Sequence, residues 1–139
     1  MVDKISWLGS PEARIINIRK FRQYINTLPF KKAIVETKKN WDAGPRINNS
    51  SFHISNIDSW PTPWDLFSQS FFSIEDQTLG IFYTLLLSDH AKMHSIKLAI
   101  AEDIIQGEKP VIVIDNYPLT NYNISAIITE NTIKNKLGE

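Results

Sequence analysis

Apolar side chains recur every three or four residues between Ile15 and Leu28, the spacing of an amphipathic helix. Ser10-Pro11-Glu12 come just before this run. Serine caps helices, proline suits the first helical position, and an acid favours the positive end of the helix dipole. Pro29 pushes the residue before it away from helical geometry. The pattern predicts a helix ending before Pro29, with its basic residues, Arg14 among them, largely on the solvent face.

The segment from Lys31 to Trp41 is ambiguous. Ala33, Val35 and Thr37 alternate with polar or exposed positions, which favours a half-buried strand, but Ile34 breaks the alternation. A turn is expected over residues 42–45, where Gly and Pro follow one another, and a polar loop over residues 48–51.

A second capping signature predicts the central helix. Ser73-Ile74-Glu75-Asp76 places a hydroxyl at the cap and acids in the first turn. Apolar residues then cover a broad face, so this helix is expected to be the most buried element and to run to about Asp89. Gly80 inside it costs roughly 1 kcal/mol relative to Ala. We interpret this glycine as allowing another segment to approach closely.

After His94 the apolar period changes from 3.6 to 2, which predicts strands over Ile96–Ala101 and Val111–Ile114, joined as an antiparallel hairpin. Asn116-Tyr117-Pro118 is expected to turn the chain, and Tyr122–Ile128 to form a third strand. The Lys-rich end is expected to be a short helix or a tail. With 139 residues, the chain is predicted to be one α+β domain with an N-terminal helix and a central buried helix packed on a small, mainly antiparallel sheet.

The most distinctive segment runs from Trp60 to Phe67. Thr62 can cap, Pro63 suits the first helical position, and Asp65 completes a capping-box spacing, so a short helix is expected. The two tryptophans of this segment and Phe67 would serve as a buried structural corner or as an interface or ligand-stacking platform, and the corner is favoured. The predicted core consists of Trp60, Trp64, Leu79, Phe82, Leu86, Leu98, Ile112 and Ile114.

Composition narrows the function classes. The chain has no cysteine and a formal net charge of zero. The first fact excludes disulfides and cysteine nucleophiles, and the second argues against a general nucleic-acid binder and favours self-association, so a homo-oligomer is an open expectation. No phosphate-cradling glycine loop or nucleophile elbow is present, so no cofactor is expected. The first residues do not resemble a signal peptide and Leu79–Leu87 is too short to span a bilayer, so we expect a protein made in a cytoplasm with no membrane partner.

Two histidines invite a metal hypothesis. His90 and His94 are four residues apart, which on one helix would place both imidazoles on the same face. A metal site needs a third ligand, and the sequence offers none beside them. We therefore expect no metal and interpret His90 as lying favourably at a helix C-terminus.

One catalytic constellation is suggested by order along the chain. Ser73 caps the central helix, His94 opens the next strand, and Asp115 ends the strand after it. This order resembles that of transglutaminase and papain-like hydrolases, in which a helix-capping cysteine is followed by histidine and aspartate on strands. The resemblance implies a degenerate or nucleophile-changed hydrolase. Because serine lacks the acidity of a thiol, we expect Ser73 to be a helix cap and assign no catalytic residue.

A second resemblance concerns the middle of the chain. Ser51-Phe52-His53, Asp58-Ser59-Trp60-Pro61-Thr62-Pro63-Trp64-Asp65-Leu66 and Leu79-Gly80-Ile81-Phe82-Tyr83-Thr84-Leu85 are similar to segments of small proteins of tailed bacteriophages. That resemblance implies a non-catalytic phage protein that binds other proteins, such as phage structural subunits of the head–tail or baseplate type. It would be made in the host cytoplasm and then enter the virion or its assembly pathway. The alternatives are the altered hydrolase above and a small phage inhibitor of a host protein.

Overall fold

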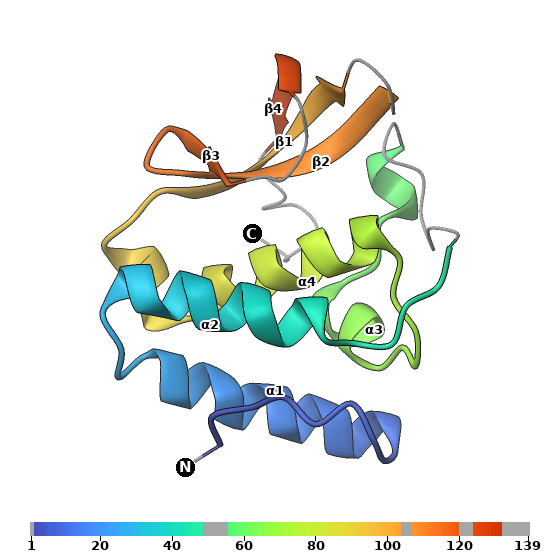
Figure 1. Ribbon diagram of the computed structural model, residues 1–139, viewed down its shortest axis with the longest axis vertical. Helices are drawn as coiled ribbons and strands as arrows, with labels where there is room; N and C mark the ends of the chain where they lie inside the picture. Colours follow the sequence, from blue (N-terminus) through green and yellow to red (C-terminus); the bar gives the residue numbers. More distant parts are fainter. Residues whose placement is uncertain (1, 49–55, 104–106, 120–123, 132–139) are drawn as a thin grey trace.

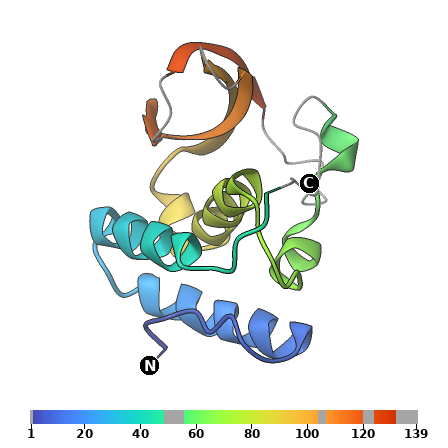
Figure 2. The same ribbon diagram turned by 45° about the vertical axis from the view of Figure 1, so that its right-hand side comes forward.

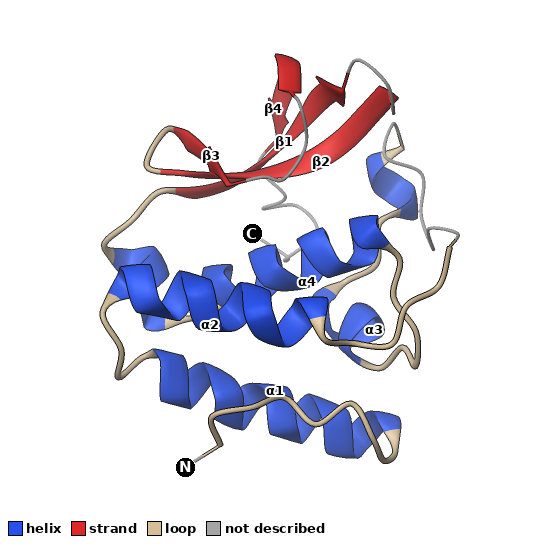
Figure 3. Ribbon diagram, in the orientation of Figure 1, coloured by secondary structure: helices blue, strands red, loops and turns tan. Residues whose placement is uncertain are grey.

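The computed structural model describes residues 2–48, 56–103, 107–119 and 124–131. Its elements, in chain order, are α1 (Pro11–Ile25), α2 (Phe30–Asp42), η1 (Ile57–Ser59), α3 (Pro63–Phe67), α4 (Ile74–Leu86), η2 (Asp89–Lys92), β1 (Ile96–Asp103), β2 (Gly107–Ile114), β3 (Tyr117–Leu119) and β4 (Ile124–Asn131). The α-helices gather on one side and the strands on the other (Figures 1 and 3). Helix α4 contacts α2, α3 and the β1–β2 pair. The predicted α+β fold, with an N-terminal helix and a central helix on an antiparallel sheet, is confirmed.

The sheet is antiparallel throughout, in the order β3-β2-β1-β4. Strands β1 and β2 pair with Leu98 opposite Ile112 and Ile96 opposite Ile114, and these four side chains belong to the main core. Both strands extend beyond the predicted bounds, because pairing continues through charged positions that carry no apolar signal. Figure 2 shows that the sheet is strongly curved.

The end of the sheet differs in detail from expectation. The chain turns at Asp115 and Asn116, whose φ angles of 51° and 73° lie in the left-handed region that Asp and Asn tolerate. The predicted turn therefore starts one residue too late, and Tyr117–Leu119 forms the short strand β3 instead. The predicted third strand appears as β4, shifted towards the C-terminus and paired with β1.

Helix α1 begins as predicted, with the Ser10 hydroxyl accepting a hydrogen bond from the Ala13 N–H at 3.1 Å. It ends at Ile25, before the expected limit at Leu28. Arg14 was expected on the solvent face and is instead buried, 4% exposed. Its guanidinium donates to two backbone carbonyls, Gly9 O at 2.7 Å and Ser68 O at 2.6 Å. The bond to Ser68 joins α1 to the residue that follows α3. Both bonds replace hydrogen bonds to water that the guanidinium loses when it is buried.

The segment from Lys31 to Trp41, which the sequence left ambiguous, forms helix α2 and not the half-buried strand that its alternation suggested. The alternation that suggested a strand does not correspond to burial: Ala33 and Thr37 are fully buried, whereas Val35 is 58% exposed. Ala33, Thr37 and Trp41 are spaced by four residues and so form one stripe of α2. This stripe packs against α4.

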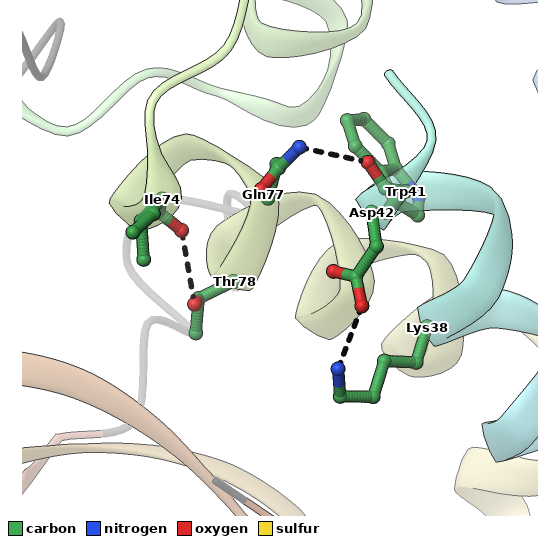
Figure 4. A network of polar contacts seen from close by, with 6 residues as sticks. All are labelled: Lys38, Trp41, Asp42, Ile74, Gln77 and Thr78. Carbon is green, nitrogen blue, oxygen red and sulfur yellow. Dashed lines mark hydrogen bonds and ion pairs between the residues drawn. The ribbon is translucent and has the colours of Figure 1, made fainter. Parts of the chain in front are cut away.

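Trp41 occupies the centre of the contact between α2 and α4. Its indole is fully buried and its Nε1–H donates to the Thr84 hydroxyl at 2.9 Å. A Cβ built at Gly80 would lie 2.5–2.6 Å from three carbons of the indole, so the interpretation that Gly80 allows a close approach is confirmed. The Gln77 amide also donates to the Trp41 carbonyl at 3.0 Å, a bond drawn in Figure 4.

Most of the predicted core is buried. Two exceptions are Trp64, which is 49% exposed, and Leu86, which is only half-buried. Helix α4 ends at Leu86 rather than near Asp89, and the chain then enters the separate turn η2. The predicted Lys-rich end and the segment Ser51-Phe52-His53 lie outside the described residues, as does most of the polar loop predicted over residues 48–51.

Candidate functional site

His94 and Asp115, two members of the candidate triad, lie side by side in the structure. The His94 Nδ1 lies 2.7 Å from Asp115 Oδ2, and the Ser95 N–H donates to Asp115 Oδ1 at 2.9 Å. The hydrogen bond from His94, followed by that from Ser95, holds the pKa of Asp115 below its usual value. An imidazole held through Nδ1 presents Nε2, the arrangement that orients a histidine as a base or a ligand.

Ser73 lies far from this pair. Its hydroxyl accepts from the Asp76 N–H at 3.0 Å, and the Asp76 carboxylate accepts from the Ser73 N–H at 3.0 Å, which completes a capping box at the start of α4. Ser73 is fully buried. His94 follows the opposite end of α4, a helix of 13 residues that is about 20 Å long. The structure therefore assembles two members of the candidate triad and leaves the third at the other end of the central helix.

His90 has a structural partner. Its Nε2 lies 2.8 Å from the Ile25 carbonyl at the end of α1, so this nitrogen carries the donated proton. The histidine thus satisfies the C-terminus of α1, and not that of the helix preceding it in the chain. Phe30 stacks with both histidines, with ring centroids 5.1 Å from His90 and 3.9 Å from His94. Among the described residues, no group of three or more His, Asp or Glu side chains could hold a metal ion.

An ion pair joins the sheet to the start of α4. The Lys109 ammonium lies 2.7 Å from the Glu75 carboxylate, and both side chains are about one-fifth exposed, at 20% and 18%. Burial, the largest single effect, raises the pKa of Glu75, but the hydrogen bond and charge of Lys109, a backbone hydrogen bond and a hydrogen bond with Ser73 together lower that pKa overall. Glu75 is therefore held as a charged structural partner of the sheet.

The Trp60–Phe67 segment is both a buried corner and a surface. Trp60 and Phe67 are buried, at 2% and 1% exposure. The Tyr83 hydroxyl donates to the Pro61 carbonyl at 2.6 Å, which fastens the segment to α4, and burial raises the pKa of this tyrosine. Trp64 instead remains about half-exposed and meets the Phe67 ring edge-on at 6.1 Å.

Sequence reasoning missed the rest of that surface. Phe71 and Ile74 are 57% and 43% exposed at the junction of α3 and α4. Ile47, 45% exposed, lies beside them because its N–H donates to the Phe72 carbonyl at 2.9 Å. We call Ile47, Trp64, Phe71 and Ile74 the junction surface. The available signal was the pair Phe71-Phe72, of which only one ring can point into the core when the backbone is extended.

Comparisons with known proteins add no relative. No protein family model, curated protein or solved structure matches the chain. Within the part of the chain that the structure describes, no helix is long and apolar enough to cross a membrane.

Replacing Asp115 with Asn should lower stability in a pH-dependent way. Since the folded-state pKa of Asp115 is lowered, its carboxylate contributes stability above the unfolded pKa of about 3.9. That contribution is lost as pH falls through the folded pKa. In thermal melts, Asp115→Asn should melt below wild type at pH 6–7, and the difference should shrink towards about pH 3. Asp89→Asn, which alters an exposed carboxylate 3.7 Å from Lys92, serves as the control. A constant difference at every pH would contradict the assignment.

Proposed function

We propose that this chain is a non-catalytic protein of tailed bacteriophages that acts by binding other proteins in the virion or its assembly pathway. The observation that carries the proposal is the junction surface, with four large apolar side chains that are each 43–57% exposed. Apolar groups gathered on a surface typically mark a protein contact. The phage origin rests on the resemblance of the Trp60–Leu66 segment, and the junction surface includes the second tryptophan of that segment.

The arrangement of the candidate triad supports a binding role over hydrolysis. Ser73 is buried and engaged in capping, and α4 separates it from His94 and Asp115. A nucleophile must reach its base within hydrogen-bonding distance. The His94–Asp115 pair instead ties the turn after β2 to the residues that precede β1.

The junction surface offers a direct test. We expect mass spectrometry to find the chain in purified particles of the phage that encodes it. Tagged Phe71→Ser should recover at least about tenfold less of the phage partner than wild type, since an exposed aromatic ring at a contact contributes on the order of 2 kcal/mol. Met93→Ser is the matched control, because Met93 is 82% exposed and lies outside the junction surface.

Three outcomes would contradict the proposal. Recovery of host proteins alone would favour the inhibitor. Equal recovery by Phe71→Ser and wild type would exclude the junction surface as the contact. Hydrolytic activity abolished by His94→Ala in a folded protein would favour the enzyme.

A further inference from the structure

Arg14 is a buried cation without an acidic partner. Its side chain is 4% exposed, and two guanidinium nitrogens donate to the carbonyls of Gly9 and Ser68. The third nitrogen, Nε, is buried and has no hydrogen-bond partner. No carboxylate of the described residues forms an ion pair with this guanidinium. Because an arginine keeps its charge when it is buried, this charge loses its hydration and gains only backbone dipoles in return.

An apolar side chain of similar volume would avoid that loss. A buried charge and an unmatched donor both destabilise the folded state, and replacing such a charge with a packed apolar group is often neutral or stabilising. The accepting carbonyls would not be stranded, because Gly9 is exposed and Ser68 is half-buried, so we expect water to replace the guanidinium there. Arginine is therefore not favoured at position 14 for stability. What an apolar residue would lack is the pair of hydrogen bonds.

These two hydrogen bonds connect segments that are distant in the sequence. Gly9 precedes the cap of α1 and has a φ of 97°, in the left-handed region that favours glycine. Ser68 is the C-cap of α3, which lies beside the first turns of α1 (Figure 1). Helix α3 has only five residues, too few to be stable in isolation, so its placement depends on tertiary contacts.

Most of the junction surface is anchored by bonds that do not involve α3. The Ile47 N–H donates to the Phe72 carbonyl at 2.9 Å, within a parallel bridge between residues 46 and 72. This bridge places Ile47 and the adjacent Phe71. The capping box of Ser73 fixes the start of α4 and with it Ile74. These three apolar side chains therefore keep their positions independently of Arg14.

Trp64 belongs to α3 and depends on other anchors. The Tyr83 hydroxyl donates to the Pro61 carbonyl at 2.6 Å, just before the cap of α3, and fixes the beginning of that helix. The Arg14 guanidinium donates to the Ser68 carbonyl, also at 2.6 Å, and fixes its end. Trp64 lies between these two points, so the buried arginine controls the end of the helix that carries it.

We infer that Arg14 is a positioning residue for the junction surface: it holds the end of α3, and thereby Trp64, in place beside Phe71 at a cost in stability. This inference rests on the proposed function, since the placement of Trp64 matters for binding only if the junction surface is a contact. An aromatic side chain that is already ordered loses less conformational freedom when a partner binds.

Arg14→Met separates positioning from stabilisation. The midpoint of urea denaturation should equal that of wild type or exceed it. The amides of Ser68 and Gln69, which close the end of α3, should exchange with solvent at least about tenfold faster in residue-resolved NMR. Amides in the middle of α4 should keep their wild-type rates. Arg19→Met makes the same change at an exposed site of α1 and should alter neither measurement.

Arg14→Lys distinguishes the bridge from the charge. An ammonium keeps the buried charge, but it is a point donor on a flexible stem and does not reproduce the planar fork that reaches two carbonyls. This variant should therefore unfold at a lower urea concentration than Arg14→Met and should still show faster exchange at Ser68 and Gln69. Equal behaviour of Arg14→Lys and wild type would contradict the bridge.

Binding is measured with the tagged chain and a lysate of phage-infected host cells. Arg14→Met should lower recovery of the phage partner at least about threefold, and it should cause no further loss in a Trp64→Ser background because it acts through that residue. In a Phe71→Ser background its effect should persist.

Two results would overturn the inference. One is unchanged exchange at Ser68 and Gln69 in Arg14→Met. The other is a lower denaturation midpoint with faster exchange throughout α4, which would make Arg14 an ordinary stabilising contact. If Phe71→Ser keeps its phage partner, the proposed function fails, whereas the exchange rates alone still decide whether Arg14 fixes α3.

Discussion

Trp41→Ala should destabilise the protein by about 3–5 kcal/mol, the range for removing a fully buried aromatic side chain and leaving a cavity. Trp41 contacts three other aromatic rings, with centroids 4.9 Å away for Trp7, 5.2 Å for Phe72 and 5.8 Å for Phe67. Truncation therefore loosens the N-terminal segment, α3 and α4 together. Since a domain is stable by only about 5–15 kcal/mol, the melting temperature should fall by at least about 10 °C.

Trp41→Phe keeps this prediction testable if the alanine variant fails to fold. Phenylalanine retains most of the apolar area but removes the N–H that donates to the Thr84 hydroxyl at 2.9 Å. Its cost should be clearly smaller than that of Trp41→Ala and should reflect a smaller cavity and one unmatched acceptor. Urea denaturation of both variants measures the two values. If Trp41→Ala cost less than about 1 kcal/mol, the indole would not be the centre of the core.

Local chemistry made the helix starts predictable. Ser10, Thr62 and Ser73 each accept a hydrogen bond from the backbone N–H three residues later. These bonds close within one turn, so the residues that decide them are adjacent in the sequence. The hairpin was equally accessible, because Ile96, Leu98 and Ile100 alternate along the first strand and Val111–Ile114 is a short apolar run on the second.

The identity of α2 depended on a distant contact instead. Three alternating residues, Ala33, Val35 and Thr37, fit a strand as well as a helix. The helix is favoured because it brings Ala33, Thr37 and Trp41 onto one stripe, and that stripe packs on a helix more than thirty residues away in the sequence. Similarly, nothing local separates Trp60 from Trp64. Trp60 precedes α3 and is buried, whereas Leu66 and Phe67 occupy the core side of α3 and leave Trp64 outside.

The contact between His94 and Asp115 follows from the hairpin, for a reason unrelated to catalysis. In an antiparallel hairpin, the residues just before the first strand meet those just after the second. Ile96 pairs with Ile114, and this register brings Asp115 beside Ser95 and His94. Ser73 could join them only if β1 began near the start of α4, but β1 follows the end of that helix. The order of residues along the chain does not indicate at which end of α4 the first strand begins.

Gly80→Ala should destabilise the protein even though alanine favours helices. Relief of the glycine penalty would contribute roughly 1 kcal/mol to α4. The added methyl would lie 2.5 Å from Cζ3 of Trp41, which is shorter than van der Waals contact, and the indole is enclosed by other rings. Overpacking of a core typically costs about 1–3 kcal/mol, so the net effect should be a loss. Urea denaturation should show a lower midpoint with an unchanged slope.

A double-mutant cycle separates the clash from any other effect at residue 80. In the Trp41→Ala background the indole is gone, and the methyl of Gly80→Ala would enter the cavity it leaves. Only the helix-propensity gain then remains, so Gly80→Ala should become neutral or stabilising by up to about 1 kcal/mol. This reversal of sign requires that the two residues touch. If Gly80→Ala had the same cost in both backgrounds, the packing of α2 on α4 through Trp41 and Gly80 would be wrong.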